Sequence, residues 1–131
     1  MGISERSIME YKFTIDGKLP SLNEFISKNR SNPALGNKMK QENQIHIEYH
    51  IMRDLHKVHI DKPVYLMYTF YEPNKKRDLD NISGFAHKVI QDALVESGVL
   101  HNDSWFYIVG FSDDFKIDKD RPRIEVVIKE I

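Results

Sequence analysis

A central strand is predicted at Val64-Tyr65-Leu66-Met67-Tyr68-Thr69-Phe70-Tyr71, where β-branched and aromatic residues follow one another without a charge. Pro63 precedes this run, and Glu72-Pro73-Asn74 closes it. After a short polar segment the pattern changes to a helical one, which is predicted to end at Gly98. Its apolar positions are Ile82, Phe85, Ala86, Val89 and Ala93. A buried strand followed by an amphipathic helix is therefore the unit around which the rest of the fold is expected to form.

Before this unit, the sequence predicts one strand, one loop and one helix. Residues 10–15 alternate between apolar and polar side chains, as a strand with one buried face does. Residues 21–36 are rich in Ser, Asn, Pro and Lys, and are predicted to form a long loop with at most a short helical turn. Residues 39–57 carry an apolar stripe through Ile47, Ile51 and Leu55, which predicts a helix.

After the unit, two more strands are predicted at residues 105–111 and 123–129. The polar stretch around residues 113–122 would join them as a hairpin-like link. The order of elements is then β-α-β-α-β-β, which predicts an α+β fold with a mixed sheet and two main helices. A chain of 131 residues has room for one such domain, assigned to residues 9–131, while residues 1–8 are expected to be a disordered extension.

Composition excludes several classes of protein. The chain has no cysteine, so disulfides, thiolate catalysis and cysteine zinc sites are excluded. No apolar run approaches the roughly 20 residues needed to cross a bilayer, and the first eight residues lack the apolar core of a secretion signal. A cytoplasmic location is expected.

The net charge of −1 is low for a nucleic-acid binder, but the charges are unevenly distributed. Basic residues dominate between residues 18 and 40, where Glu24 is the single acid, and Lys75-Lys76-Arg77 adds a second basic run. The first group consists of Lys18, Lys28, Arg30, Lys38 and Lys40. Such a distribution can give a neutral molecule one basic face that attracts a polyanion. The alternative for each run is a solvated loop.

Two carboxylates, Asp78 and Asp80, follow the second basic run directly. They would project to the same side if the backbone there is extended, so both are predicted to lie just before the helix. Together they could hold a hard cation, since Mg²⁺ takes one or two protein carboxylates and fills its other positions with water and phosphate. The alternative is that Asp80 or Asn81 caps the helix, which contributes about 1 kcal/mol.

The segment Lys75-Lys76-Arg77-Asp78-Leu79-Asp80-Asn81 resembles the signature of the RusA family of Holliday-junction resolvases, a basic run followed by Asp-Leu-Asp-Asn and a helix. The likeness continues in Asp92-Ala93-Leu94, in Gly98, and in the acidic turn that contains Asp103. Leu19-Pro20-Ser21-Leu22-Asn23 resembles the Pro-Ser-x-Asn stretch that follows the first strand of the family. The resemblance spans most of the chain.

The resemblance implies a homodimeric, Mg²⁺-dependent endonuclease, with Mn²⁺ as a possible substitute, that resolves four-way DNA junctions in recombination and repair. It implies catalytic, metal-binding roles for Asp78, Asp80 and Asp103. The family lysine corresponds to Lys88 only if a gap is allowed, because four residues after Asp80 this chain has Gly84. Resolvases of this family are common in prophages. Phosphate contacts are expected from Lys75, Lys76, Arg77, Lys28, Arg30, Lys38 and Lys40.

Three questions stay open at this point. A helix of residues 81–97 would be roughly 25 Å long, so Asp103 must fold back to reach Asp80 or reach it across the dimer. A noncatalytic protein that binds branched DNA is the second function considered, although carboxylates beside phosphate favour the enzyme. His46 and His50, at i and i+4, could offer two zinc ligands but lack a third, and surface histidines are the simpler interpretation.

Overall fold

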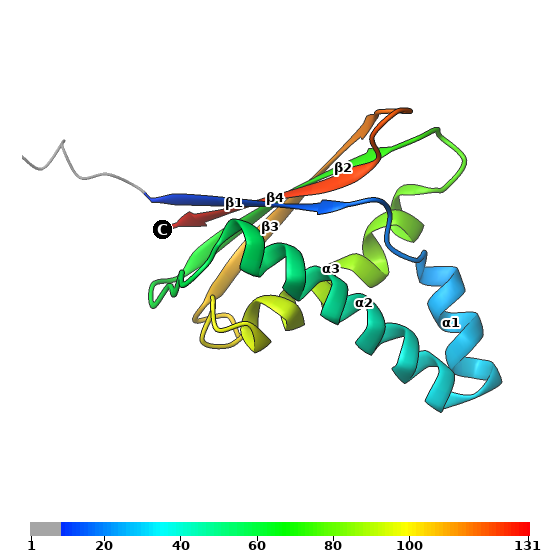
Figure 1. The fold of residues 1–131 in the computed structure, drawn as a ribbon, viewed down its shortest axis with the longest axis horizontal. Helices are drawn as coiled ribbons and strands as arrows, with labels where there is room; N and C mark the ends of the chain where they lie inside the picture. Colours follow the sequence, from blue (N-terminus) through cyan, green and yellow to red (C-terminus); the bar gives the residue numbers. More distant parts are fainter. Residues whose placement is uncertain (1–8) are drawn as a thin grey trace, which may run out of the picture.

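The computed structural model describes residues 9–131 as one α+β domain with three helices and a four-stranded mixed sheet (Figure 1). Residues 1–8, which the sequence predicts to be a disordered extension, lie outside the described residues. In chain order the elements are β1 (Glu10–Asp16), α1 (Leu22–Ser31), α2 (Pro33–Asp54), β2 (Val64–Glu72), α3 (Leu79–Glu96), β3 (Ile108–Ile117) and β4 (Arg123–Glu130). The predicted order β-α-β-α-β-β is confirmed, with two consecutive helices where the first was expected.

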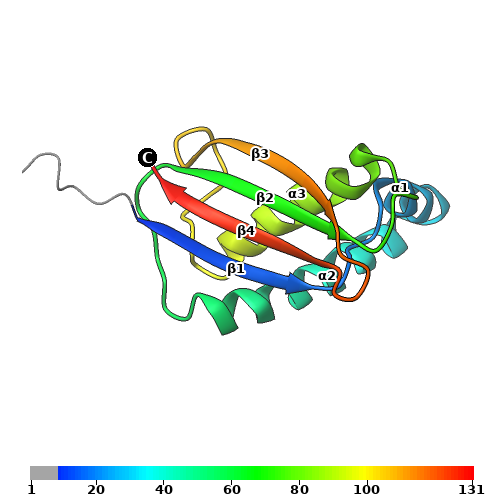
Figure 2. The same cartoon turned by 90° about the horizontal axis from the view of Figure 1, so that it is seen from above.

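The strands lie in the order β1-β4-β2-β3 (Figure 2). β2 and β3 are parallel neighbours joined through α3, while β4 lies between β1 and β2 and is antiparallel to both. The prediction of a hairpin between the last two strands is wrong, because β2 separates β3 from β4. β2 is nevertheless an inner strand, as its apolar sequence predicts, and β3 is left at one edge of the sheet.

All three helices cover one face of the sheet, and the core lies between the two layers (Figure 1). On the sheet side every second residue of β2 is buried, including Leu66, Tyr68 and Phe70. On the helix side the predicted apolar face of α3 is buried as expected. The stripe of α2 formed by Ile47, Ile51 and Leu55 is also buried. Within the described part of the chain, no helix is long and apolar enough to span a bilayer.

The loop predicted over residues 21–36 is wrong, since most of it is helical. Ser21 caps α1 by accepting from the Glu24 backbone N–H at 3.1 Å, and the Glu24 side chain accepts from the Ser21 backbone N–H at 3.2 Å. Asn32 caps α2, with Pro33 at the first helical position. Ser-x-x-Glu and Asn-Pro are signals for the start of a helix. The loop was predicted instead because the segment is rich in Ser, Asn, Pro and Lys. The second helix therefore begins six residues before its predicted start at Met39.

β3 also differs from its prediction, because it begins three residues later and extends through Asp113 and Asp114 to Ile117. Trp105 and Phe106, predicted to lie in this strand, lie in the preceding loop and are 91% and 82% exposed. The polar residues expected in a hairpin loop instead form the outer part of an edge strand. Edge strands commonly carry charged side chains, which explains why polarity there did not indicate a loop.

Candidate active site at the start of α3

Asp78 and Asp80 flank the first residue of α3. Asp78 is the N-cap residue, with an extended backbone (φ −68°, ψ 155°), and its side chain makes no capping hydrogen bond. Asp80 lies within the first helical turn. The prediction that both precede the helix is therefore wrong for Asp80, and neither Asp80 nor Asn81 is the cap. A carboxylate in the first turn is stabilised by the helix dipole, and the Asp78 carboxylate remains free of helix capping.

Arg77 anchors the segment that leads into the helix. Its guanidinium donates to both carboxylate oxygens of Glu72, at 3.0 and 2.8 Å, and to the Leu19 carbonyl at 2.9 Å. Glu72 is only 5% exposed at the end of β2, and Arg77 is largely covered as well. Sequence reasoning did not single out Glu72, and it assigned Arg77 to phosphate contact. The structure gives Arg77 the role of tying the turn before Asp78 to the sheet.

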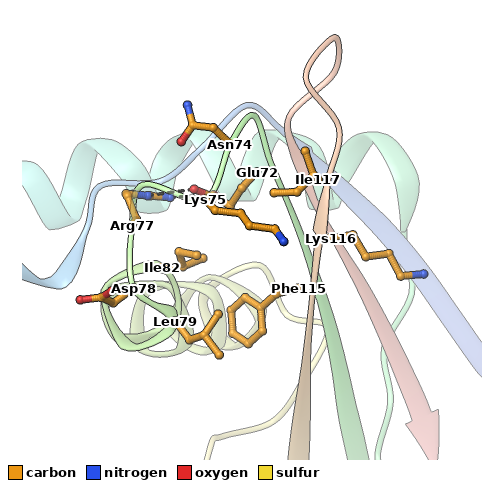
Figure 3. Close-up of a pocket in the computed structure, with 10 residues that line it drawn as sticks. All are labelled: Glu72, Asn74, Lys75, Arg77, Asp78, Leu79, Ile82, Phe115, Lys116 and Ile117. Carbon is orange, nitrogen blue, oxygen red and sulfur yellow. Dashed lines mark hydrogen bonds and ion pairs between the residues drawn. The ribbon is translucent and has the colours of Figure 1, made fainter.

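A cavity of about 350 Å³ opens between the start of α3 and the end of β3 (Figure 3). Leu79, Ile82 and Phe115 form its apolar part, and the Lys75 side chain reaches into it. The Lys116 side chain points away from it, toward the Tyr71 ring on the other face of the sheet. Asp78 borders the same cavity. The Lys75 ammonium is therefore held at the hollow, while the Asp78 carboxylate points outward from its edge (Figure 3). A carboxylate and an ammonium group close to one helix start are suited to a phosphate that a cation and a lysine bind together.

The start of α3 is also fixed from the side of α1. The backbone N–H of Asn23 donates to the Asn81 side-chain oxygen at 3.1 Å. This bond satisfies one of the free N–H groups in the first turn of α1. The hydrogen bond connects two segments that are 58 residues apart in the chain. Asn81 therefore positions α1 against the Asp78–Asp80 segment.

Asp103 lies in the loop between α3 and β3, at the other end of α3. Lys88 brings it into an ion-pair network, because its ammonium is 3.8 Å from Asp103 and 3.2 Å from Asp92. Asp92 is bound in turn by Lys40 of α2 at 2.6 Å. The structure thus brings Lys88 and Asp103 together, and it shows that Lys40 is engaged within the protein.

The three aspartates do not form one metal-binding group within a single chain. Across residues 9–131, no three His, Asp or Glu side chains lie close enough to hold a metal ion. α3 has 18 residues and is therefore about 27 Å long. Asp78 and Asp80 lie at its first turn, and Asp103 follows its far end. The chain after α3 folds back beside the second half of the helix, where Asp103 meets Lys88, and does not bring Asp103 into one group with Asp78 and Asp80.

Gly84, at the position where the family signature has its lysine, faces α1. A Cβ atom there would lie 2.9 Å from the Leu22 side chain, so a larger residue cannot fit without displacing it. Lys88 is eight residues after Asp80, about 12 Å farther along the axis and roughly 80° around it. Its side chain is 65% exposed. The packing of α1 therefore accounts for the absence of a lysine at position 84, and Lys88 lies nearer to Asp103 than to the helix start.

The remaining basic residues differ in how they are engaged. Lys28 and Lys38 border a surface hollow of about 330 Å³ between α1 and α2, and Arg30 lies in the last turn of α1. Among the side-chain contacts of the described residues, none engages Lys28, Arg30, Lys38, Lys75 or Lys76. These five stay available to bind a polyanion, unlike Arg77 and Lys40.

The histidine pair on α2 has a structural explanation. His50 is buried, with Nδ1 2.9 Å from the His46 carbonyl oxygen and Nε2 3.3 Å from an Asp16 carboxylate oxygen. Desolvation acts to raise the pKa of Asp16, but hydrogen bonds from Arg53 and His50 outweigh it and leave that pKa below its ordinary value. A carboxylate held in this way connects α2 to β1. No third ligand joins the pair among residues 9–131.

Free carboxylates beside a lysine at a helix start have the chemistry to hold a cation next to a phosphate group. Comparison with protein-family models gives the family: the model of the endodeoxyribonuclease RusA matches residues 18–129. The chain belongs to this family, which places it among the endodeoxyribonucleases. No curated protein matches the chain significantly. The match begins before α1 and ends within β4, so it covers nearly the whole described domain.

Proposed function

We propose that this chain is a Mg²⁺-dependent endonuclease that resolves Holliday junctions as a homodimer. The observation that carries the proposal is the family match over residues 18–129. The matched segment includes Asp78, whose carboxylate makes no capping hydrogen bond, and the neighbouring Asp80, with Lys75 close by. The family supports nuclease activity on branched DNA. The metal, the dimer and the strict preference for four-way junctions are parts of the proposal.

Asp78 and Asp80 have the chemistry that Mg²⁺ requires. Carboxylate oxygens are its usual protein ligands, and one or two of them suffice when substrate phosphate and water complete the shell. When bound, Mg²⁺ would supply Lewis acidity at the scissile phosphate. Lys75, at the rim of the cavity, would bind a neighbouring phosphate and hold the strand in place. The apolar part of the cavity, formed by Leu79 and Phe115, would limit access of bulk water.

The third aspartate is proposed to come from the partner protomer. One chain leaves Asp103 beside the second half of α3, and a second chain in antiparallel orientation would carry its own Asp103 to the start of the first α3. Because Lys88 and Asp103 are 3.8 Å apart, they would enter the partner's site together. Lys88 could then stabilise the negative charge that develops on the phosphate. A shared site would make cleavage depend on dimer formation.

A two-fold dimer also suits the substrate. It presents two equivalent active sites, which match paired cuts in opposing strands of a four-way junction. Lys28, Arg30 and Lys38, on α1 and the start of α2, would extend the contact along the DNA backbone, giving affinity without sequence readout. A role in recombination and repair, and the cytoplasmic location expected from the sequence, follow from this substrate.

The proposal is tested with a labelled mobile four-way junction and a linear duplex of the same sequence, each incubated with Mg²⁺ or EDTA. We expect paired cuts in the junction alone, only with Mg²⁺, and no cuts by an Asp80→Asn variant. Asp120→Asn is the matched control, since Asp120 lies in the turn between β3 and β4. Binding of the junction without cleavage in Mg²⁺ or Mn²⁺ would instead establish a noncatalytic junction-binding protein.

A further inference from the structure

Exposed apolar side chains gather at the beginning of β3. Trp105 is the single tryptophan of the chain and is 91% exposed, and Phe106 beside it is 82% exposed. Val109 and Phe111 continue this surface along β3, each about half exposed. We call these four residues the aromatic patch. Contiguous exposed apolar surface of this kind marks a contact site, and tryptophan is one of the residue types enriched among those that contribute most to binding energy.

The cavity at the start of α3 offers a matching receptor. Leu79, Ile82, Phe115 and Ile117 give it an apolar lining, and Leu79 and Ile117 are themselves about half exposed. Its volume of about 350 Å³ is sufficient for an indole ring. Trp105 of the same chain cannot reach it, because the ten residues of β3, about 30 Å in length, separate them.

We propose that Trp105 of a second copy of this chain docks in the cavity formed by Leu79, Phe115 and Ile117. The proposal rests on the dimer of the proposed function and names the surface that forms it. A two-fold axis near the middle of β3 exchanges the two ends of the strand, so each aromatic patch meets the cavity of the partner. Asp103 lies two residues before Trp105, and Asp78 borders the cavity. Docking of Trp105 therefore carries the partner's Asp103 toward the start of α3, where Asp78 and Asp80 lie.

Charges support a second copy as the occupant. Asp103 accompanies the aromatic patch, and the Lys75 ammonium lies at the cavity, so docking brings one pair of opposite charges together across the contact. The Asp103 carboxylate, together with those of Asp113 and Asp114 on β3, disfavours binding of DNA to the patch, because carboxylates repel phosphate. Asp113 and Asp114 also disfavour a continuous backbone ladder between two β3 edges. The contact is thus made by side chains at the two ends of the strand.

The first test uses the fluorescence of Trp105, which reports on one position because the chain has no other tryptophan. At concentrations where sedimentation shows a dimer, we expect emission at short wavelength, moving to long wavelength on dilution to the monomer. Ile117→Lys should give a monomer with long-wavelength emission throughout, while Tyr49→Ser on α2 should behave as the wild type. Far-UV circular dichroism verifies that both variants fold.

The second test exploits the absence of cysteine. A Trp105→Cys variant mixed with an Ile117→Cys variant should form a disulfide-linked dimer on mild oxidation, whereas Trp105→Cys mixed with Tyr49→Cys should not. A wild-type dimer without the 105–117 cross-link, and with Trp105 still exposed to water, would overturn the inference. Junction cleavage by that dimer would leave the proposed function intact. Burial of Trp105 only on addition of junction DNA would also overturn the inference, since the patch would then bind bases.

Discussion

The Arg77 guanidinium holds the buried Glu72 carboxylate through two parallel hydrogen bonds, at 3.0 and 2.8 Å. This pair joins the end of β2 to the residue that precedes Asp78. Arg77 also donates to the Leu19 carbonyl, so three segments meet at one guanidinium. The position of the candidate active site depends on this contact, which makes a residue from the basic run part of the framework.

Arg77→Ala should destabilise the fold by about 3 kcal/mol, because it leaves the buried Glu72 carboxylate without its partner. Arg77→Lys should recover only part of this loss, since an ammonium cannot form the two parallel bonds. Urea denaturation measures both effects. Lys76→Ala, one residue earlier and exposed, is the control and should change stability by less than about 0.5 kcal/mol. Equal stability of the Arg77→Ala and Lys76→Ala variants would contradict the assigned role.

Gly84→Lys should destabilise the protein by about 1–3 kcal/mol, although lysine favours helix more than glycine does. The reason is steric, because a Cβ atom at this position lies 2.9 Å from the Leu22 side chain. The substitution should also fail to restore cleavage to a Lys88→Ala variant. Thermal melting and the junction assay measure the two effects. A stable double variant with restored cleavage would show that the lysine acts from position 84.

Lys88→Ala should lower junction cleavage about 100-fold while leaving stability within about 0.5 kcal/mol of the wild type. Its ion pairs with Asp92 and Asp103 are exposed and contribute little to folding. Single-turnover cleavage with saturating protein separates this effect from weaker DNA binding. Lys119→Ala in the turn between β3 and β4 is the matched loss of one charge. Cleavage by the Lys88→Ala variant at the rate of this control would exclude a catalytic role for Lys88.

Acid should destabilise the fold through the carboxylates that hydrogen bonds stabilise in their charged form. The guanidinium of Arg53 lowers the pKa of Asp54, with help from the Thr14 backbone N–H. In the same way, Arg123 lowers the pKa of Asp118. A pKa lower in the folded than in the unfolded chain gives stability that is complete above the unfolded value of about 3.9. That stability is lost as pH falls through the folded value.

Denaturation in urea between pH 6 and pH 3 should therefore show stability falling below about pH 4. Asp54→Asn should be less stable at pH 6 and should lose less on acidification, because its side chain has no proton to gain. Curves for the wild type and the Asp54→Asn variant that stay parallel over this range would contradict the assignment. Glu42→Gln, on the exposed face of α2, is the control, because no ion pair or hydrogen bond among the described residues engages its carboxylate.

The sequence predicted the parts of the fold that depend on local periodicity. The buried faces of β2 and α3, and the stripe of Ile47, Ile51 and Leu55, follow from spacing alone. The order of the strands does not follow from spacing, because a polar link between β3 and β4 is equally compatible with a hairpin and with a crossing past β2. α1 was missed because polar composition outweighed the capping signal of Ser21 and Glu24.

The sequence proposes residues for the candidate site but does not give its geometry. The segment around Asp78 and Asp80 was identified from its motif, but the cap position depends on where α3 begins, which the motif does not specify. Glu72 could not be recognised as the partner of Arg77, since that pairing depends on β2 and α3 meeting in space. Asp103 and Trp105 have proposed roles that require a second chain, which the sequence of one chain does not show.

The central claim is that two chains together form a site that cuts four-way junctions. Asp80→Asn and Asp103→Asn variants are each prepared, then mixed under conditions that exchange protomers, and supplied with labelled junction and Mg²⁺. Each variant alone should be inactive, while the mixture should regain cleavage, because a heterodimer carries one site with Asp78 and Asp80 of one chain and Asp103 of the other. A mixture as inactive as its components, beside an active wild type, would contradict the shared site. A wild type that binds but does not cut the junction would contradict the nuclease itself.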